Sequence, residues 1–93
     1  MRALRERNRQ HVRVLKESQP CTDCGNFYPH YVMQYDHIGS DKVADVSRLV
    51  QAGTYSIARI EAEIAKCELV CANCHAKRSW QRMLNNGEVA ESG

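Results

Sequence analysis

Two cysteine pairs of the form CxxC constrain this chain more than any other feature of its sequence. The first lies in CTDCG and the second in LVCANCHAKRS, with residues 25–70 between the two pairs. A CxxC turn places two thiolates on one side of a knuckle, and two such knuckles complete the tetrahedral sulfur shell that zinc prefers. We therefore predict a closed, structural zinc site made by four cysteines: Cys21, Cys24, Cys71 and Cys74.

Other interpretations of the cysteines stay open at this point. The letters CANCH fit the covalent attachment of haem, but that interpretation would leave Cys21 and Cys24 without a role. Redox thiols or an iron–sulfur centre would use the same two pairs. The odd fifth cysteine, Cys67, argues against a disulfide framework and fits a small buried apolar residue better than a metal ligand.

The length and the charge distribution of the chain limit its size class and its possible partners. The chain has 93 residues, which is one small domain near the size at which a hydrophobic core alone gives marginal stability. No stretch has the pattern of a signal peptide or a membrane span, so we expect a cytoplasmic protein with no membrane partner. The net charge is only +2, but the basic residues gather at the two ends of the chain. This distribution predicts a polyanionic partner, most simply nucleic acid, with a solvated basic helix as the alternative.

Local patterns predict one domain over residues 1–84, with a basic N-terminal helix and a core over 21–84. Residues 85–93 are expected to be disordered. Helices are expected at 2–17, 41–51, 56–66 and 73–84, and extended segments at 31–38 and 67–70.

The two middle helices have recognisable boundaries. Ser40 or Asp41 is expected to cap the first, which would bury Val43, Val46 and Val50 and end at Gly53. The second is expected to begin at Ser56 and to bury its three isoleucines: Ile57, Ile60 and Ile64.

Histidines provide the second notable pattern. Asp36-His37 ends the predicted strand just before Gly39, and His75 follows the second CxxC at the start of a helix. Singly, each fits an ordinary strand-end turn or a surface histidine. Together, a carboxylate and an imidazole suit Mg²⁺, Mn²⁺ or Zn²⁺, and a further histidine suits a general base. Phosphodiester hydrolysis needs such a base, a Lewis acid and cations that hold the polyanion.

In this order, CTDCG, YDHI and LVCANCHAKRS resemble the HNH endonucleases, whose core is the ββα-metal or His-Me finger. The similarity is to small phage and bacterial HNH proteins in which two CxxC pairs brace the motif, and it covers Cys21 to Arg78. It implies a small α+β fold, with a ββα-metal core braced by the zinc knuckles and with flanking and inserted helices. It also implies that His37 is the general base and that Asp36 and His75 hold one catalytic divalent ion.

The resemblance implies DNA as the substrate and phage packaging machinery as a further partner. A single site of this kind cuts one strand at a time, so a double-strand break needs a homodimer or two visits. Basic residues at both ends would contact the DNA phosphates: Arg2, Arg5, Arg9, Arg13, Lys77, Arg78 and Arg82.

Two features depart from the simplest HNH pattern. Many members carry an asparagine a few residues before the second CxxC, where this chain has Ala65, Lys66 and Cys67. Asn73 either takes the orienting role toward the loop that carries His37 or caps the final helix. The connection between the two motifs is also long enough for two helices, which suggests an insertion that faces DNA or forms a dimer.

Adjacent residues of a regular strand point to opposite faces, yet Asp36 and His37 are both expected at one site. The strand must therefore end, twist or bulge there. The sequence as a whole predicts a zinc-braced HNH endonuclease or nickase. The alternative is a non-catalytic, zinc-stabilised module that binds nucleic acid or acts as an adaptor.

Overall fold

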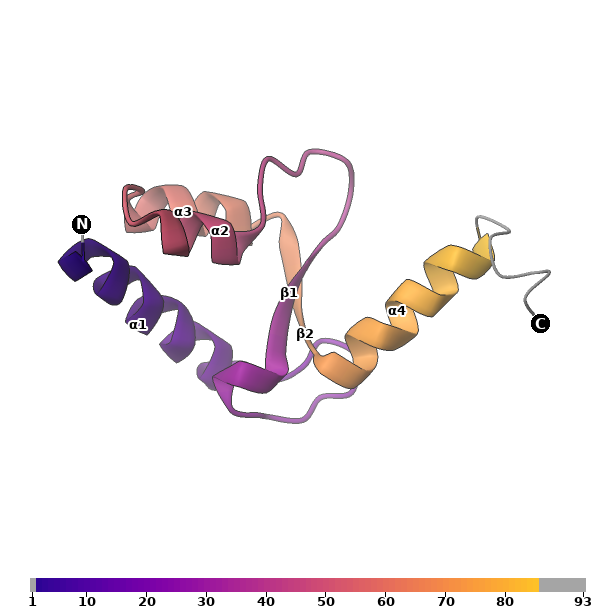
Figure 1. The fold of residues 1–93 in the computed structure, drawn as a ribbon. Coiled ribbons are helices and arrows are strands. Elements are labelled where there is room, and N and C mark those ends of the chain that lie inside the picture. The colour runs from indigo at the N-terminus through magenta and orange to yellow at the C-terminus, as the bar shows by residue number, and fades with distance from the viewer. Residues whose placement is uncertain (1, 86–93) are drawn as a thin grey trace.

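Two antiparallel strands form the centre of the fold, with a helix on either side of them (Figure 1). The computed structural model describes residues 2–85, which fold as a small α+β protein. In chain order its elements are α1 (Arg2–Ser18), a 3₁₀ turn η1 (His30–Val32), β1 (Met33–His37), α2 (Val46–Ala52), α3 (Ile57–Ile64), β2 (Cys67–Cys71) and α4 (Ala72–Asn85).

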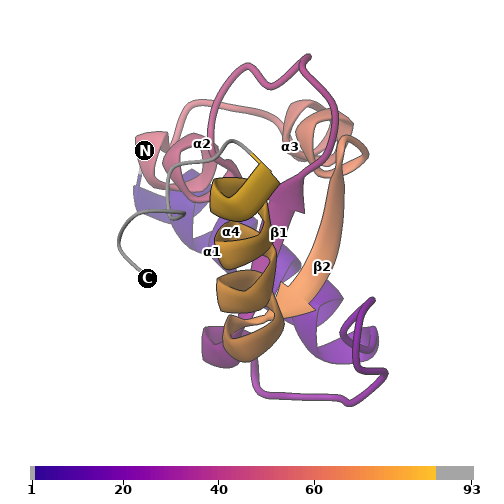
Figure 2. The same ribbon diagram turned by 90° about the vertical axis from the view of Figure 1, so that its right-hand side faces the viewer.

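The strand register brings the two chemical motifs together. Met33 lies opposite Cys71, and His37 lies opposite Cys67. One further hydrogen bond, from the Ile38 N–H to the Lys66 carbonyl at 3.0 Å, extends the pairing beyond β1. Figures 1 and 2 show α1 on one side of the strands and α4 on the other.

Two apolar cores stabilise the chain, and they lie at different places along the strands. The helical core joins α1, α2 and α3 through Val12, Val46, Leu49, Val50 and Ile60. The cysteine core joins the strands to the first knuckle and to α4 through Cys21, Met33, Leu69, Val70, Cys71 and Cys74. Tyr35 packs against both cores and so connects them.

The predicted N-terminal helix is confirmed, and a polar residue interrupts its apolar stripe. Val12 is buried, and Leu4 and Leu15 are half-buried at the same helical spacing. Asn8 lies between them, fully buried, and donates from Nδ2 to the Tyr55 carbonyl at 2.9 Å. This hydrogen bond satisfies the buried amide and ties α1 to the loop before α3.

The boundary between α2 and α3 is also as predicted. Gly53 follows α2 with φ 71° and donates its N–H to the Val50 carbonyl. This left-handed conformation is one that glycine adopts without a steric penalty. Ser56 caps α3, since its side chain accepts a hydrogen bond from the Arg59 N–H at 3.1 Å. Within α3, Ile60 is fully buried, and Ile57 and Ile64 are half-buried.

The predicted start of α2 is wrong. Neither Ser40 nor Asp41 begins a helix, because α2 begins at Val46 after Asp45. The Val43 N–H instead donates to Glu63 Oε2 at 3.0 Å, and the Val43 side chain is exposed rather than buried. The Lys66 ammonium also binds the Asp41 carbonyl at 2.9 Å. These tertiary hydrogen bonds hold residues 41–43 outside any helix.

The strand predicted at 31–38 is shorter than expected, because its first residues belong to the turn η1. Pro29 precedes this turn, and its carbonyl accepts the Val32 N–H at 3.0 Å. The predictions of an extended segment before the second CxxC and of a final helix are confirmed by β2 and α4. The prediction of disorder over residues 85–93 is wrong at its first position, because Asn85 is the last residue of α4. Residues 86–93 lie outside the described residues.

Within residues 2–85, no helix combines the length and apolar character that a membrane crossing requires.

Candidate functional site

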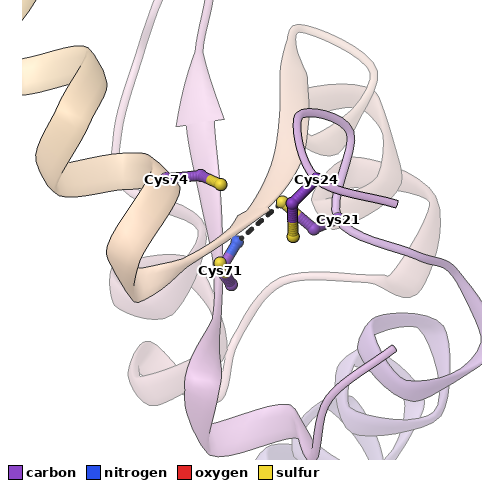
Figure 3. A group of neighbouring side chains, drawn as sticks. All are labelled: Cys21, Cys24, Cys71 and Cys74. Atoms are coloured by element: carbon purple, nitrogen blue, oxygen red, sulfur yellow. Dashed lines mark hydrogen bonds between the residues drawn. The ribbon is translucent and has the colours of Figure 1, made fainter. Parts of the chain in front are cut away.

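Four cysteines from two distant segments converge where β2 ends and α4 begins (Figure 3). Their Sγ atoms all lie within 4.8 Å of one another. Zinc in a tetrahedral thiolate shell sets its sulfurs roughly 3.8 Å apart, from Zn–S bonds of about 2.3 Å. The four predicted ligands are therefore placed as a closed metal site requires: Cys21, Cys24, Cys71 and Cys74.

Local hydrogen bonds shape the first knuckle around its sulfurs. The Gly25 N–H donates to the Cys21 carbonyl at 2.9 Å, and Gly25 has φ 78°, a conformation suited to glycine. The Thr22 N–H donates to the Leu69 carbonyl at 2.8 Å and so docks the knuckle on β2. The Cys71 N–H points at Cys21 Sγ at 3.3 Å, drawn as the dashed line in Figure 3.

The thiols differ sharply in acidity. Burial alone would raise the pKa of Cys21, but N–H groups of Cys24, Cys71 and Asp23 lower it to about 6. Burial, together with hydrogen bonds to the other sulfurs, raises the pKa of Cys74 to about 12. One thiolate is thus stabilised by the backbone, whereas four adjacent thiolates need a cation to balance their charge. This donor set fits a structural metal ion such as zinc.

The spare cysteine lies outside this cluster, as predicted. Cys67 packs against the helical core, and its thiol donates to the Glu63 carbonyl at 3.4 Å. Burial raises its pKa to about 11, so the thiol stays protonated near neutral pH and is a poor ligand or nucleophile.

The second predicted site lies at the opposite end of the strands, in a pocket of about 470 Å³. Asp36, His37 and His75 all line this pocket, together with Lys42 and Ser79. Asp36 and His37 do point to opposite sides of the strand, the first toward α4 and the second toward α3. Both still reach the pocket because β1 ends at His37 and Gly39 turns the chain with φ 83°.

Asp36 is buried and held by two arginines of α4. Arg82 binds it through two nitrogens, at 3.0 Å to Oδ1 and 2.6 Å to Oδ2, and Arg78 adds a contact to Oδ2 at 2.8 Å. Burial alone would raise the pKa of Asp36, but the hydrogen bonds from Arg82 and Arg78 hold it below its ordinary value. The carboxylate is therefore ionised at neutral pH.

His75 lies in the first turns of α4, one residue after Cys74 of the four-cysteine cluster. Its Nε2 is 3.8 Å from Asp36 Oδ1, so one carboxylate oxygen and one imidazole nitrogen face each other across the pocket. Of residues 2–85, only the four cysteines form a group of three or more metal-binding atoms. A divalent ion held by Asp36 and His75 would take its remaining ligands from water or substrate.

His37 is oriented by a residue that the sequence analysis did not identify. Its Nε2 lies 2.8 Å from Oε2 of Glu63, a fully buried carboxylate on α3. The sequence does contain an indication of this role, because Glu63 lies between Ile60 and Ile64 on the apolar face of the helix. An acid at such a position needs buried partners. Asn73, by contrast, is exposed in the first turn of α4 and makes no side-chain hydrogen bond with the described residues.

The basic residues predicted to contact DNA occupy different surroundings. Arg5 and Arg9 lie beside Gln51 in a shallow hollow on the α1 side, and Arg13 is half-buried on the same helix. The Arg2 side chain lies outside the described part of the structure. Figures 1 and 2 show the two strands between α1 and α4, so the basic residues of these two helices come from opposite sides of the sheet.

On α4 itself, Lys77 and Gln81 line a hollow of about 430 Å³ next to the pocket. Arg78 is committed to three carboxylates, because it also binds Asp23 at 2.7 Å and Glu68 at 2.7 Å. These hydrogen bonds raise its pKa above the ordinary value. Arg78 therefore connects the first knuckle, both strands and α4.

No known protein family, curated protein sequence or solved structure matches this chain.

Proposed function

We propose that this protein is a metal-dependent DNA endonuclease or nickase of the HNH type, braced by a structural zinc ion. The observation that carries the proposal is the convergence of Asp36, His37 and His75 on one pocket. These residues come from the end of β1 and the start of α4, with the strand β2 between them, which is the ββα order that the resemblance implies.

The pocket residues suit the separate tasks of phosphodiester hydrolysis. His37 would accept a proton from the attacking water, because its ring lines the pocket and is held in place through Nε2. Asp36 and His75 would hold the divalent ion, which supplies Lewis-acid stabilisation of charge on the phosphate when bound. Lys42 and Lys77, exposed at the pocket and at the neighbouring hollow, would bind the flanking phosphates.

The four cysteines have no chemical step in this proposal. Cys71 and Cys74 lie at the junction of β2 and α4, directly before His75. A metal ion there would fix α4 against the strands and so fix the distance between His75 and Asp36. The closed sulfur shell leaves no open coordination position for a substrate.

A second candidate function is a zinc-stabilised module that binds nucleic acid, or acts as an adaptor, without cleavage. The observation that favours it is the arginine pair on Asp36, since Arg82 and Arg78 already satisfy much of this carboxylate. In this alternative Asp36 would have a structural role, and nucleic-acid binding would depend on the basic residues alone. Adaptor function would show weak DNA binding with little dependence on salt, whereas phosphate contacts make binding fall steeply with salt.

A plasmid-nicking assay tests the enzyme. We expect zinc-loaded protein to relax supercoiled DNA when Mg²⁺ or Mn²⁺ is added, and His37→Ala to reduce the rate by about 10²–10⁴-fold through loss of the base. His11→Ala is the matched control, because His11 pairs with Glu61 on the surface, at 2.6 Å and away from the pocket. The enzyme proposal is overturned if folded, zinc-loaded wild-type protein shows no metal-dependent cleavage with any divalent ion, or if His37→Ala cleaves like the wild type.

A further inference from the structure

Glu63 is the one acidic side chain that the described structure encloses completely. It lies on the inner face of α3 with no exposed surface. A buried carboxylate is costly unless each of its oxygens is hydrogen-bonded or paired with a cation. Its partners therefore show what the position is for.

The two carboxylate oxygens of Glu63 accept hydrogen bonds from different groups. Oε1 accepts from the Arg59 guanidinium at 3.2 Å and from the Lys66 ammonium at 3.2 Å. Oε2 accepts from the Val43 N–H at 3.0 Å and lies 2.8 Å from Nε2 of His37. One oxygen is thus neutralised by cations of α3 and its C-terminal end, and the other reaches the pocket histidine.

These contacts keep Glu63 ionised. The hydrogen bond from the Val43 N–H contributes most to lowering the pKa of the carboxyl, and those from His37, Lys66 and Arg59 add to it against the opposing effect of burial. An ionised carboxylate oxygen has no proton to donate and can only accept. The hydrogen between Glu63 and His37 must therefore belong to the imidazole Nε2.

We infer that Glu63 is a positioning residue, which fixes the His37 ring with its proton on Nε2 and leaves Nδ1 as the basic nitrogen. The inference rests on the proposed function, in which His37 takes a proton from water. Among residues 2–85, Glu63 is the hydrogen-bond partner of this ring, and the His37 side chain is only 10% exposed. A carboxylate on one imidazole nitrogen sets the tautomer and stabilises the cation that forms when the other nitrogen takes a proton.

A second histidine–glutamate pair shows what a surface contact of the same type looks like. His11 and Glu61 are 2.6 Å apart, but their side chains are 30% and 49% exposed. Water can replace either partner there, so such a pair constrains its ring little. Glu61 also lies on α3, two residues from Glu63, which makes it a matched control.

Nitrogen-15 NMR of the imidazole rings tests the tautomer directly in wild-type, zinc-loaded protein. With the ring neutral, we expect the His37 spectrum to show a protonated Nε2 and an unprotonated Nδ1. A proton on Nδ1, or an equal mixture of the two tautomers, would overturn the inference. This measurement requires neither an active enzyme nor a variant that folds.

Steady-state nicking by Glu63→Gln tests the consequence for the reaction. We expect kcat to fall by about 10–100-fold, as for other residues that orient a functional histidine, while KM for DNA stays within about twofold. Glu61→Gln should retain both values. An unchanged kcat in folded, zinc-loaded Glu63→Gln would contradict a positioning role.

The two experiments separate this inference from the proposed function. If the wild type cleaves no DNA while His37 carries its proton on Nε2, the nuclease proposal fails and the ring assignment stands. If the wild type cleaves and the proton is on Nδ1, the role of Glu63 fails and the nuclease proposal stands.

Discussion

Asp36 and Glu63 are both buried carboxylates near the pocket, and cations balance each of them. Asp36 is held by side chains of α4, Arg78 and Arg82, whereas Glu63 is held by Arg59 and Lys66 at its own end of α3. Removing one partner of such a pair leaves an uncompensated charge, which costs more than the intact pair contributes. Asp36 therefore holds β1 against α4, and Glu63 holds its own helix against the residues that it contacts.

Acid unfolding should reveal the charge of Glu63. Its pKa is lowered in the folded protein from an ordinary value near 4.5, so the unfolded chain binds this proton more readily. The corresponding stability is full above the unfolded value and is lost as the pH falls below it. We expect the urea concentration at the unfolding midpoint to decrease as the pH is lowered from about 6 to about 3. This decrease should be steeper for the wild-type protein than for Glu63→Gln.

Glu61→Gln is the control for this comparison and should follow the wild-type curve. Zinc release in acid affects all three proteins, so the informative quantity is the difference between their curves. Parallel curves for wild type and Glu63→Gln would mean that the carboxylate contributes no charge-dependent stability.

The sequence predicted correctly those helix boundaries that depend only on residues of the same turn. Gly53 and Ser56 act within their own turns, so their roles could be inferred from neighbouring residues. Ser40 and Asp41 offered the same type of signal, but Glu63 captures the Val43 N–H and no helix begins there. That contact joins residues far apart in sequence, and no local pattern contains it.

The same distinction applies to the candidate site. Cysteine spacing predicted the sulfur cluster, because each CxxC is a local turn. The sequence also identified Asp36, His37 and His75, which the fold brings to one pocket. It gave no indication that Arg78 and Arg82 would turn inward onto Asp36, since a basic residue on an exposed helix is ordinarily solvated.

Two serines allow a test at the level of the element. Ser56→Ala removes the side-chain acceptor that caps α3 and should lower the free energy of unfolding by about 1 kcal/mol. Ser40→Ala, at a position where the sequence pattern predicts a helix cap, should change the free energy of unfolding by less than about 0.5 kcal/mol, because Ser40 lies on the exposed loop. Urea denaturation of the two variants measures both values, and equal losses would contradict the assigned boundaries.

At the scale of the whole molecule, the two cores depend on the metal to different degrees. The helical core uses aliphatic side chains of three helices, whereas half of the buried residues in the cysteine core are the proposed ligands themselves. Structural zinc contributes about 10–16 kcal/mol of apparent binding energy in small domains. This is as large as the entire stability of a typical domain, about 5–15 kcal/mol.

Replacing one ligand should therefore unfold the sheet. We expect Cys24→Ser to reduce the bound zinc to well below one equivalent and to abolish the cooperative thermal transition. Cys67→Ser is the control. Because Cys67 lies outside the cluster, this variant should retain one equivalent of zinc. Metal analysis and circular dichroism measure the two effects, and full zinc occupancy in Cys24→Ser would exclude Cys24 as a ligand.

The separation of the two knuckles along the chain has a consequence for the order of synthesis. The residues of the helical core all precede Ile64, so α1, α2 and α3 can begin to associate before β2 has been made. Cys21 and Cys24 must wait for Cys71 and Cys74, which at about 5–20 residues per second takes roughly 2–10 s. During that interval the ribosome carries a nascent chain with two uncommitted thiols. A metal ion bound by all four cysteines could therefore complete its ligand shell only after that interval.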